Sequence, residues 1–170
     1  MRDMIRALGE EDFDAYIALR QQALRECPLS FSASAEDDFA SSHDSLRQQL
    51  ALAPDWVIFG AFDRGALAGS VGLFRQRRVK TAHRAQIWGM YVAPAYREHG
   101  FGARLLDAAI ARARALPGIA WIDLDVTTAA SAARRPYERA GFQVWGTRRD
   151  ALRHEGHAVE EHHMSLQIVV

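Results

Sequence analysis

The stretch from Ile87 to Ala109 constrains the fold more than any other part of the sequence. It opens with an apolar run, rich in β-branched and aromatic residues and stopped by Pro94, which predicts a buried strand. After a glycine-containing loop, apolar side chains recur at helical spacing at Leu105, Leu106 and Ala109. The chain must therefore lead a buried strand through a short loop into the N-terminus of a helix.

The loop between them has the sequence Arg97-Glu98-His99-Gly100-Phe101-Gly102. Two glycines two positions apart let the backbone curl tightly. The first N–H groups of the helix have no partner inside it, and the helix dipole adds partial positive charge at the same point. The sequence therefore predicts an anion site here, with phosphate as the expected ligand.

Two familiar phosphate loops fit this spacing poorly. A nucleotide-triphosphate P-loop requires lysine and then serine or threonine after its last glycine, but Gly102 is followed by Ala103. A dinucleotide-binding loop requires a third glycine where Leu105 stands and should follow its strand directly. Asp123 and Asp125 lie about the right distance further on for a ribose contact, which keeps the dinucleotide alternative open.

A third pattern, Arg/Gln-x-x-Gly-x-Gly/Ala, is matched in full by the loop. With Tyr-Val-Ala-Pro-Ala-Tyr before it and Arg-Leu-Leu after it, the stretch resembles the acetyl-CoA-binding motif of the GNAT (Gcn5-related N-acetyltransferase) superfamily. The resemblance implies that backbone N–H groups surround the cofactor pyrophosphate, from Arg97, Glu98, His99, Gly100, Phe101, Gly102 and Ala103. It also implies that a strand edge follows the pantetheine arm and polarises the acetyl carbonyl, at Met90, Tyr91 and Val92.

A second segment resembles the other signature of the superfamily, Asn-x-x-Ala-x-x-x-Tyr-Glu-x-x-Gly-Phe. Residues 133–142 read Ala-Arg-Arg-Pro-Tyr-Glu-Arg-Ala-Gly-Phe. The resemblance implies that Tyr137 protonates the departing thiolate and that Ala133 contacts the cofactor. Ala130 replaces the asparagine of the signature, and one cofactor contact is therefore expected to be missing. Pro136 predicts a kinked or interrupted helix.

The sequence assigns no general base. Gln86 occupies the strand position where histone-acetylating relatives carry a catalytic glutamate, and an amide side chain cannot accept a proton. We expect Gln86 to orient the acceptor or a water molecule. His83 and the strand carboxylates Asp123 and Asp125 remain candidates that would act through water.

Three other groups of residues have both a functional and a structural interpretation. The resemblance implies that Phe31 and residues 36–38 border the acceptor site, although a solvated acidic helix start is the simpler interpretation. The basic run from Arg75 to Lys80 suits nucleic acid, an acidic acceptor or the ribose phosphate of coenzyme A, but it is typical of solvated surface. Four histidines lack the spacing of a metal-binding helix and are interpreted as surface residues of a hairpin, at His154, His157, His162 and His163.

Composition limits the partners and the compartment. The 21 basic residues equal the 21 acidic ones, so no overall basic field attracts nucleic acid or an anionic membrane. The sequence contains no signal core and no apolar run long enough to span a bilayer. Cys27 is the only cysteine, which excludes an intramolecular disulfide and favours a reducing compartment. We therefore expect a cytoplasmic protein.

The order of the predicted elements is β-α-α-β-β-β-α-β-α-β-β. Strands are predicted at 4–8, 56–62, 67–74, 83–92, 119–126, 142–145 and 158–168. Helices are predicted from Glu10 to just before Pro28, at 36–52, after the glycine loop, and at 127–139. This order predicts a single domain over residues 1–170, of α/β class and α+β type, with a mixed central sheet and helices on both faces. It is also the order of the GNAT superfamily, so the resemblance extends over nearly the full length.

The leading hypothesis is an N-acetyltransferase that uses acetyl-CoA as co-substrate and no metal. It transfers the acetyl group to a primary amine by direct attack in a ternary complex, and no motif positions Cys27 as a nucleophile. The acceptor is a small-molecule or peptide amine, with no nucleic-acid or membrane partner, and the final strands are free to pair across a homodimer. The alternative, motivated by Gln86, Ala130 and Pro136, is a non-catalytic acyl-CoA-binding sensor.

Overall fold

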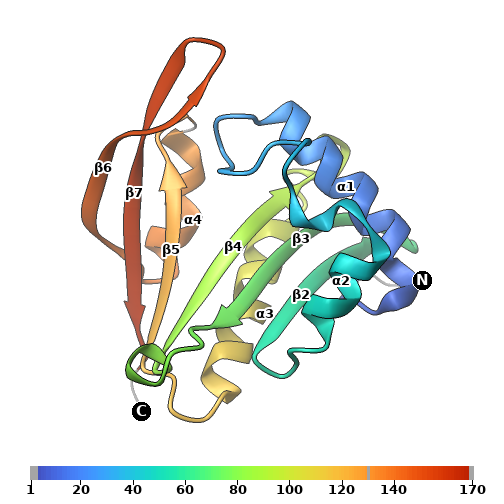
Figure 1. The fold of residues 1–170 in the computed structure, drawn as a ribbon, viewed down its shortest axis with the longest axis horizontal. Helices are drawn as coiled ribbons and strands as arrows, with labels where there is room; N and C mark the ends of the chain where they lie inside the picture. The colour runs from blue at the N-terminus through green and yellow to red at the C-terminus, as the bar shows by residue number, and fades with distance from the viewer. Residues whose placement is uncertain (1–3, 130, 169–170) are drawn as a thin grey trace.

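Seven strands form one mixed sheet in the computed structural model, which describes residues 4–129 and 131–168 (Figure 1). The strands are β1 Met4–Ala7, β2 Trp56–Asp63, β3 Ala66–Arg75, β4 Arg84–Val92, β5 Trp121–Thr127, β6 Gln143–His154 and β7 His157–Gln167. The helices are α1 Phe13–Glu26, α2 His43–Leu50, α3 Phe101–Ala115 and α4 Arg135–Arg139. The predicted element order and the mixed sheet are both confirmed.

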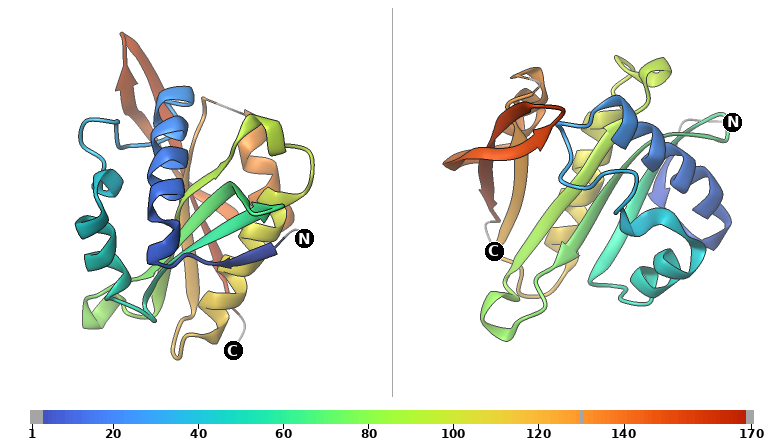
Figure 2. Two further views of the ribbon diagram at one scale, coloured as in Figure 1. Left: turned by 90° about the vertical axis from the view of Figure 1, so that its right-hand side faces the viewer. Right: turned by 45° about the horizontal axis from the view of Figure 1, so that its top comes forward.

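The sheet runs in the order β1-β2-β3-β4-β5-β7-β6, and all neighbouring strands are antiparallel except β4 and β5. Helices α1 and α2 cover one face, and α3 and α4 lie on the other (Figure 2). The apolar stripe of α3, which includes Leu105, Leu106 and Ala109, is buried in the larger core against the sheet. Phe13 and Tyr16 of α1 belong to a second core on the opposite face. Each face therefore has its own apolar layer.

The parallel contact between β4 and β5 is short. Only three residue pairs join the two strands, of which Gln86 with Asp123 is the last. Beyond this point β4 continues to Val92 and β5 to Thr127 without further pairing to each other. The strands diverge there, and the sheet opens into a wedge-shaped gap near its centre (Figure 1).

A β-bulge in β4 sorts its side chains between the two faces of the sheet. Ser70 of β3 lies opposite Tyr91, but Gly72 lies opposite Trp88, so β4 contains one extra residue. Gly89 takes this position with a φ of +64°, which glycine adopts at little cost. As a result Met90 packs toward the core beneath α3, whereas Trp88 and Tyr91 face the side of α1.

The predicted helix at 36–52 was wrong in its first half. Residues 35–37 form a turn, Phe39–Ser41 is a short 3₁₀ segment, and α2 begins only at His43. Ser42 caps α2 by accepting a hydrogen bond from the Ser45 N–H at 3.2 Å. Asp38 is drawn away from the expected helix by a buried ion pair with Arg20 of α1.

Two C-terminal elements also differ from the sequence prediction. The helix predicted at 127–139 is not continuous: a 3₁₀ segment at Ser131–Arg134 precedes α4. This agrees with the interruption that Pro136 predicted. Pro136 lies in the first turn of α4, where a missing N–H costs no helical hydrogen bond. Ala130 lies outside the described residues. Strand β6 extends to His154, beyond the predicted end at Trp145. The prediction was too short because the exposed residues of β6 are polar and hide the strand pattern.

Among the helices of the described ranges, none combines the length and the apolar composition that crossing a bilayer requires.

Candidate active site

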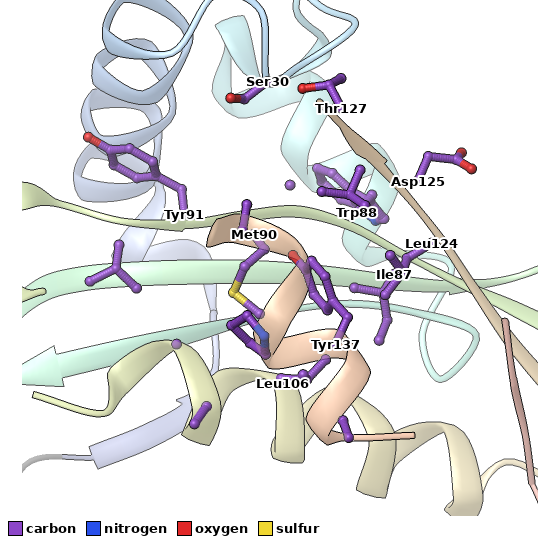
Figure 3. Close-up of a pocket in the computed structure, with 18 of the residues that line it drawn as sticks. Ser30, Ile87, Trp88, Met90, Tyr91, Leu106, Leu124, Asp125, Thr127 and Tyr137 are labelled. Carbon is purple, nitrogen blue, oxygen red and sulfur yellow. The ribbon is translucent and has the colours of Figure 1, made fainter. Parts of the chain in front are cut away.

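The wedge between β4 and β5 contains a cavity of about 670 Å³ (Figure 3). Its walls come from residues 87–92 of β4, residues 124–127 of β5, the first turns of α3, and α4. Ser30 and Phe31, in the loop after α1, close one end. Because β4 stops pairing with β5 at Gln86, its free edge faces this cavity with unpaired main-chain groups. A ligand with amide groups can therefore bind along β4 as an added strand would.

The three β4 residues predicted for cofactor binding all line the cavity, but in different ways. Met90 directs its side chain into the cavity toward Tyr137 (Figure 3). Tyr91 turns its ring toward α1, where its hydroxyl donates a hydrogen bond to Glu26 at 2.7 Å. Tyr91 therefore offers only its main chain to a ligand, and Val92 packs into the core beneath α3.

The predicted phosphate loop has the backbone shape that an anion site needs. Glu98 and Gly100 both have left-handed backbone angles, with φ of +67° and +77°, and α3 begins at Phe101. Alternating handedness of this kind turns successive N–H groups toward one side. The Phe101 side chain is buried in the core, so Phe101 can contribute only its N–H group.

The side chain of Arg97 fastens the loop instead of pointing into it. Its Nε donates to the Val92 carbonyl at 2.9 Å, and its guanidinium forms an ion pair with Glu26 of α1. The hydrogen bond from Tyr91 and the ion pair with Arg97 together keep the pKa of Glu26 below its usual value. Arg97 of the loop, Tyr91 of β4 and Glu26 of α1 thus hold these three elements together.

The structure brings most of the predicted site residues around one cavity. The residues that line it are Met90, Tyr91, Val92, Arg97, Gly102, Ala103, Ala133 and Tyr137. The remaining four lie in the adjacent loop outside this lining, at Glu98, His99, Gly100 and Phe101. His99 hydrogen bonds through Nδ1 to the Arg97 carbonyl at 2.7 Å, which holds its ring against the loop.

Tyr137 extends from α4 into the cavity, and its hydroxyl is directed toward Met90 (Figure 3). Burial raises the pKa of Tyr137 to about 12, so the hydroxyl keeps its proton at neutral pH. Its ring packs edge to face against Phe142, with 6.3 Å between ring centroids. A protonated hydroxyl held in an apolar wall is suited to donating a proton inside the cavity.

Cys27 also lines the cavity, at the end of α1. Burial, and to a smaller extent the charge of Glu26, raises the pKa of the Cys27 thiol above its usual value. The thiol is therefore kept protonated, and a protonated thiol is a poor nucleophile.

Polar and aromatic side chains also line the cavity, at Ser30, Phe31, Trp88 and Thr127. The Thr127 hydroxyl donates to the Leu29 carbonyl at 2.7 Å. This bond holds the loop after α1 against the end of β5. Of the acceptor contacts expected from the sequence, only Phe31 reaches the cavity. Residues 36 and 37 are exposed on a turn, and Asp38 is buried in its ion pair.

The structure places the candidate bases in different surroundings. His83 is exposed ahead of β4 and lines neither of the two cavities described for this sheet. Asp123 is occupied by Arg84, whose Nε donates at 2.7 Å, and by the Ser165 hydroxyl at 2.5 Å. Gln86 and Asp123 line a second cavity of the sheet. Of the four candidates, Asp125 is the one that lines both cavities.

The four histidines all lie on the hairpin of β6 and β7, as predicted, but only His154 and His157 are exposed. His154 and His157 flank the turn, but His162 and His163 lie further along β7. The His163 side chain is only 16% exposed, and its Nδ1 lies 2.6 Å from the Asp125 carboxylate. Sequence spacing gave no sign of this contact, because it depends on the register between β5 and β7. The basic run lies away from the cavity, and Arg75 in it pairs with Asp55 at 3.2 Å.

Comparison with known proteins agrees with this geometry. Residues 16–142 match the family model described as "Acetyltransferase (GNAT) family". A GNAT acetyltransferase of Streptococcus pneumoniae is 22% identical, with a TM-score of 0.85 over 98% of this chain and 100% of that one. The ribosomal-protein-alanine N-acetyltransferase of Brucella melitensis is 21% identical, with a TM-score of 0.84 over 97% and 99%. The yncA protein of Salmonella typhimurium, solved with its cofactor acetyl-CoA, is 18% identical, with a TM-score of 0.85 over 98% and 94%. Since the family model spans most of the chain, this protein belongs to the GNAT family of acetyltransferases.

Proposed function

We propose that this acetyltransferase moves the acetyl group of acetyl-CoA to a primary amine by direct attack in a ternary complex. The observation that carries the proposal is the cavity at the divergence of β4 and β5, with the phosphate loop at one end and Tyr137 in its wall. The acceptor is a small molecule or the amine of a peptide. The Brucella relative, which by its name acetylates ribosomal-protein alanine, makes an N-terminal alanine one acceptor worth testing.

The residues fit acetyl-CoA along the length of the cavity. N–H groups of the loop at 97–103 and the N-terminus of α3 suit the pyrophosphate. The free edge of β4 at residues 90–92 suits the amides of the pantetheine arm. The apolar wall formed by Leu106, Val126 and Ala133 suits its methylene groups.

The residues of the site can supply the proton that the reaction needs. Acetyl-CoA brings an acetyl thioester, whose carbonyl carbon accepts the amine. A main-chain N–H of β4 stabilises the oxygen of that carbonyl as negative charge develops on it. Tyr137 donates its hydroxyl proton to the sulfur when the carbon–sulfur bond breaks. Because the Cys27 thiol is held protonated, the chain offers no thiolate there to form an acetylated enzyme.

Cofactor binding is tested by thermal unfolding with acetyl-CoA, and with NAD as the comparison ligand. A ligand near 100 times its dissociation constant adds about 2.7 kcal/mol of stability, which raises the midpoint by roughly 5 to 10 °C in a domain of this size. The variant Ala103→Glu should abolish this shift, since it adds a carboxylate in the first turn of α3 beside the proposed pyrophosphate. Ala111→Glu makes the same change at an exposed position later in α3 and should keep the shift. A shift with NAD instead would favour a dinucleotide site.

Catalysis is tested by the release of coenzyme A thiol with a panel of amines. The panel contains tyramine, spermidine, L-lysine and a hexapeptide that begins with alanine. Initial rates at varied concentrations of both substrates should give intersecting double-reciprocal lines. Parallel lines, or an acetylated protein seen by intact mass without amine, would contradict direct attack. Saturable acetyl-CoA binding without thiol release from any amine would favour the sensor.

A further inference from the structure

Two carboxylates among the described residues line the cavity, and they lie on different sides of it. Asp107 extends from α3, on the side where the phosphate loop leads into the helix. Asp125 lies on β5, on the face that carries Asp123 and Thr127 and turns toward α1. The neighbouring side chains Leu124 and Val126 point the other way, into the core beneath α3. Asp125 is therefore the cavity carboxylate that an acceptor would meet when it enters beside α1.

Tyr137 and Asp125 both border the cavity, and their side chains lie on opposite faces of the sheet. Tyr137 packs against the core beneath α3, and its hydroxyl points toward Met90 (Figure 3). The Asp125 carboxylate points away from both Met90 and Tyr137 (Figure 3). A thioester held in the gap between β4 and β5 would lie between the two groups. An amine that attacks from one face would then leave the sulfur on the other, next to the hydroxyl. The geometry separates a proton acceptor for the amine from a proton donor for the sulfur.

A hydrogen-bonding network from β7 and β4 holds the Asp125 carboxylate. His163 Nδ1 lies 2.6 Å from Oδ1, and because a carboxylate only accepts, the imidazole must donate there. The Trp145 ring stacks on His163 at 5.3 Å and fixes the orientation of the imidazole. The amide of Gln86 lies 3.5 Å from Oδ2, at the limit of a hydrogen bond, so Oδ2 keeps capacity to accept a proton.

Besides His163, the charged groups near Asp125 are Glu161, Arg148 and Arg84. Glu161 of β7 lies beside Asp125 and His163, and these three residues form a cluster with ligand atoms within 4.8 Å of one another. Burial and the nearby charge of Asp125 raise the pKa of Glu161, and Arg148 of β6 lies 3.7 Å from its carboxylate. Arg84 is occupied by Asp123 and adds no free positive charge at this point.

Resting on the proposed function, we propose that Asp125 is the catalytic base that deprotonates the acceptor amine and that His163 is its positioning residue. Asp125 Oδ2 takes one proton from the ammonium group, and the freed lone pair forms the carbon–nitrogen bond. Tyr137 gives its proton to the sulfur as the carbon–sulfur bond breaks, and water takes the second proton from nitrogen. Asp125 returns its proton through water to Tyr137, so each turnover releases one proton to solution.

The first test compares two amines of different basicity. Tyramine is protonated at neutral pH and needs a base, whereas methoxyamine is already neutral. The variant Asp125→Asn should lower kcat/KM for tyramine, or for the best amine of the panel, by about a hundredfold. With methoxyamine the same variant should retain its rate within a few-fold. The matched control is Glu160→Gln, which removes an exposed carboxylate one residue from Glu161 and should leave both rates unchanged.

The second test addresses His163. His163→Phe keeps a ring to stack on Trp145 but removes the donor to Asp125, and it should lower the tyramine rate about tenfold and alter its pH profile. His163→Asn replaces Nδ1 with an amide nitrogen and should restore most of the rate. If Asp125→Asn does not fold, these two variants decide the question, because both retain the carboxylate. Equal rates for the two His163 variants would refute the positioning role.

The outcomes separate this inference from the proposed function. No acetyl-CoA shift and no thiol release by the unaltered protein would refute the proposed function and the inference with it. Normal acetyl-CoA binding with tyramine turnover by Asp125→Asn within twofold of the unaltered protein would refute only the inference. An equal loss with methoxyamine would also refute it, because the carboxylate would then not act as a base. Loss of turnover in EDTA, restored by Zn²⁺, would overturn it in favour of a metal in the Asp125–Glu161–His163 cluster.

Discussion

Replacing Gly89 with alanine should lower the free energy of unfolding by about 2 kcal/mol. The left-handed backbone at this position, with a φ of +64°, costs a residue with a Cβ about 1 to 2 kcal/mol. The added Cβ would also lie 3.3 Å from Nη1 of Arg20, closer than ordinary contact. Arg20 cannot easily retreat, because Asp38 holds its guanidinium in a buried ion pair at 2.9 Å. At roughly 2 to 4 °C per kcal/mol, the unfolding midpoint should fall by about 4 to 8 °C.

The assay is thermal unfolding without ligand, followed by acetyl-CoA titration of the unaltered protein and of Gly89→Ala. Gly100→Ala is the matched comparison, since Gly100 has a φ of +77° but no heavy atom within 4 Å of the added Cβ. It should lose stability through backbone strain alone and therefore less than Gly89→Ala. In Gly89→Ala the bulge shifts, Met90 moves relative to the cavity, and acetyl-CoA should bind more weakly. An unchanged midpoint for Gly89→Ala would refute the account of the bulge.

Three further predictions concern catalysis and stability. Tyr137→Phe should lower kcat about a hundredfold while the acetyl-CoA thermal shift stays the same, measured by thiol release and thermal unfolding. Leu105→Ala should cost about 2 to 5 kcal/mol in chemical denaturation, since Leu105 is fully buried against the sheet. The Arg6 guanidinium lowers the pKa of Asp12, so this carboxylate contributes stability above its unfolded pKa that is lost as pH falls through its folded pKa. Denaturation at pH 7 and pH 3 should therefore show a smaller acid loss for Asp12→Asn, and an equal loss would contradict the assignment.

Local patterns predicted the parts of the site that one segment builds alone. The Arg97–Gly102 loop, the buried strand before it and the apolar stripe of α3 follow from turn chemistry and periodicity, and the structure has all three. The interruption near Pro136 likewise follows from a missing N–H. These features depend on neighbours within a few residues, and no distant contact alters them.

Features set by distant contacts could not be predicted from the sequence. The bulge at Gly89 depends on the register between β3 and β4, and glycines inside strands also occur at tight bends and where another backbone approaches closely. The start of α2 depends on Arg20, which draws Asp38 out of the expected helix. The contact of Asp125 with His163 depends on the antiparallel pairing of β5 with β7 across 38 positions. Such registers reflect the packing of the whole sheet.

The early end of pairing between β4 and β5 also bears on how freely this sequence can evolve. A binding surface made of main-chain amides survives almost any side-chain replacement, provided that the two strands still part at the same place. Chains that share only 18 to 22% of their residues with this one keep the same fold over nearly their whole length. Under the proposed function, the side chains around the mouth of the cavity can therefore change with the acceptor, while the main-chain edge of β4 that suits the cofactor is kept with the fold.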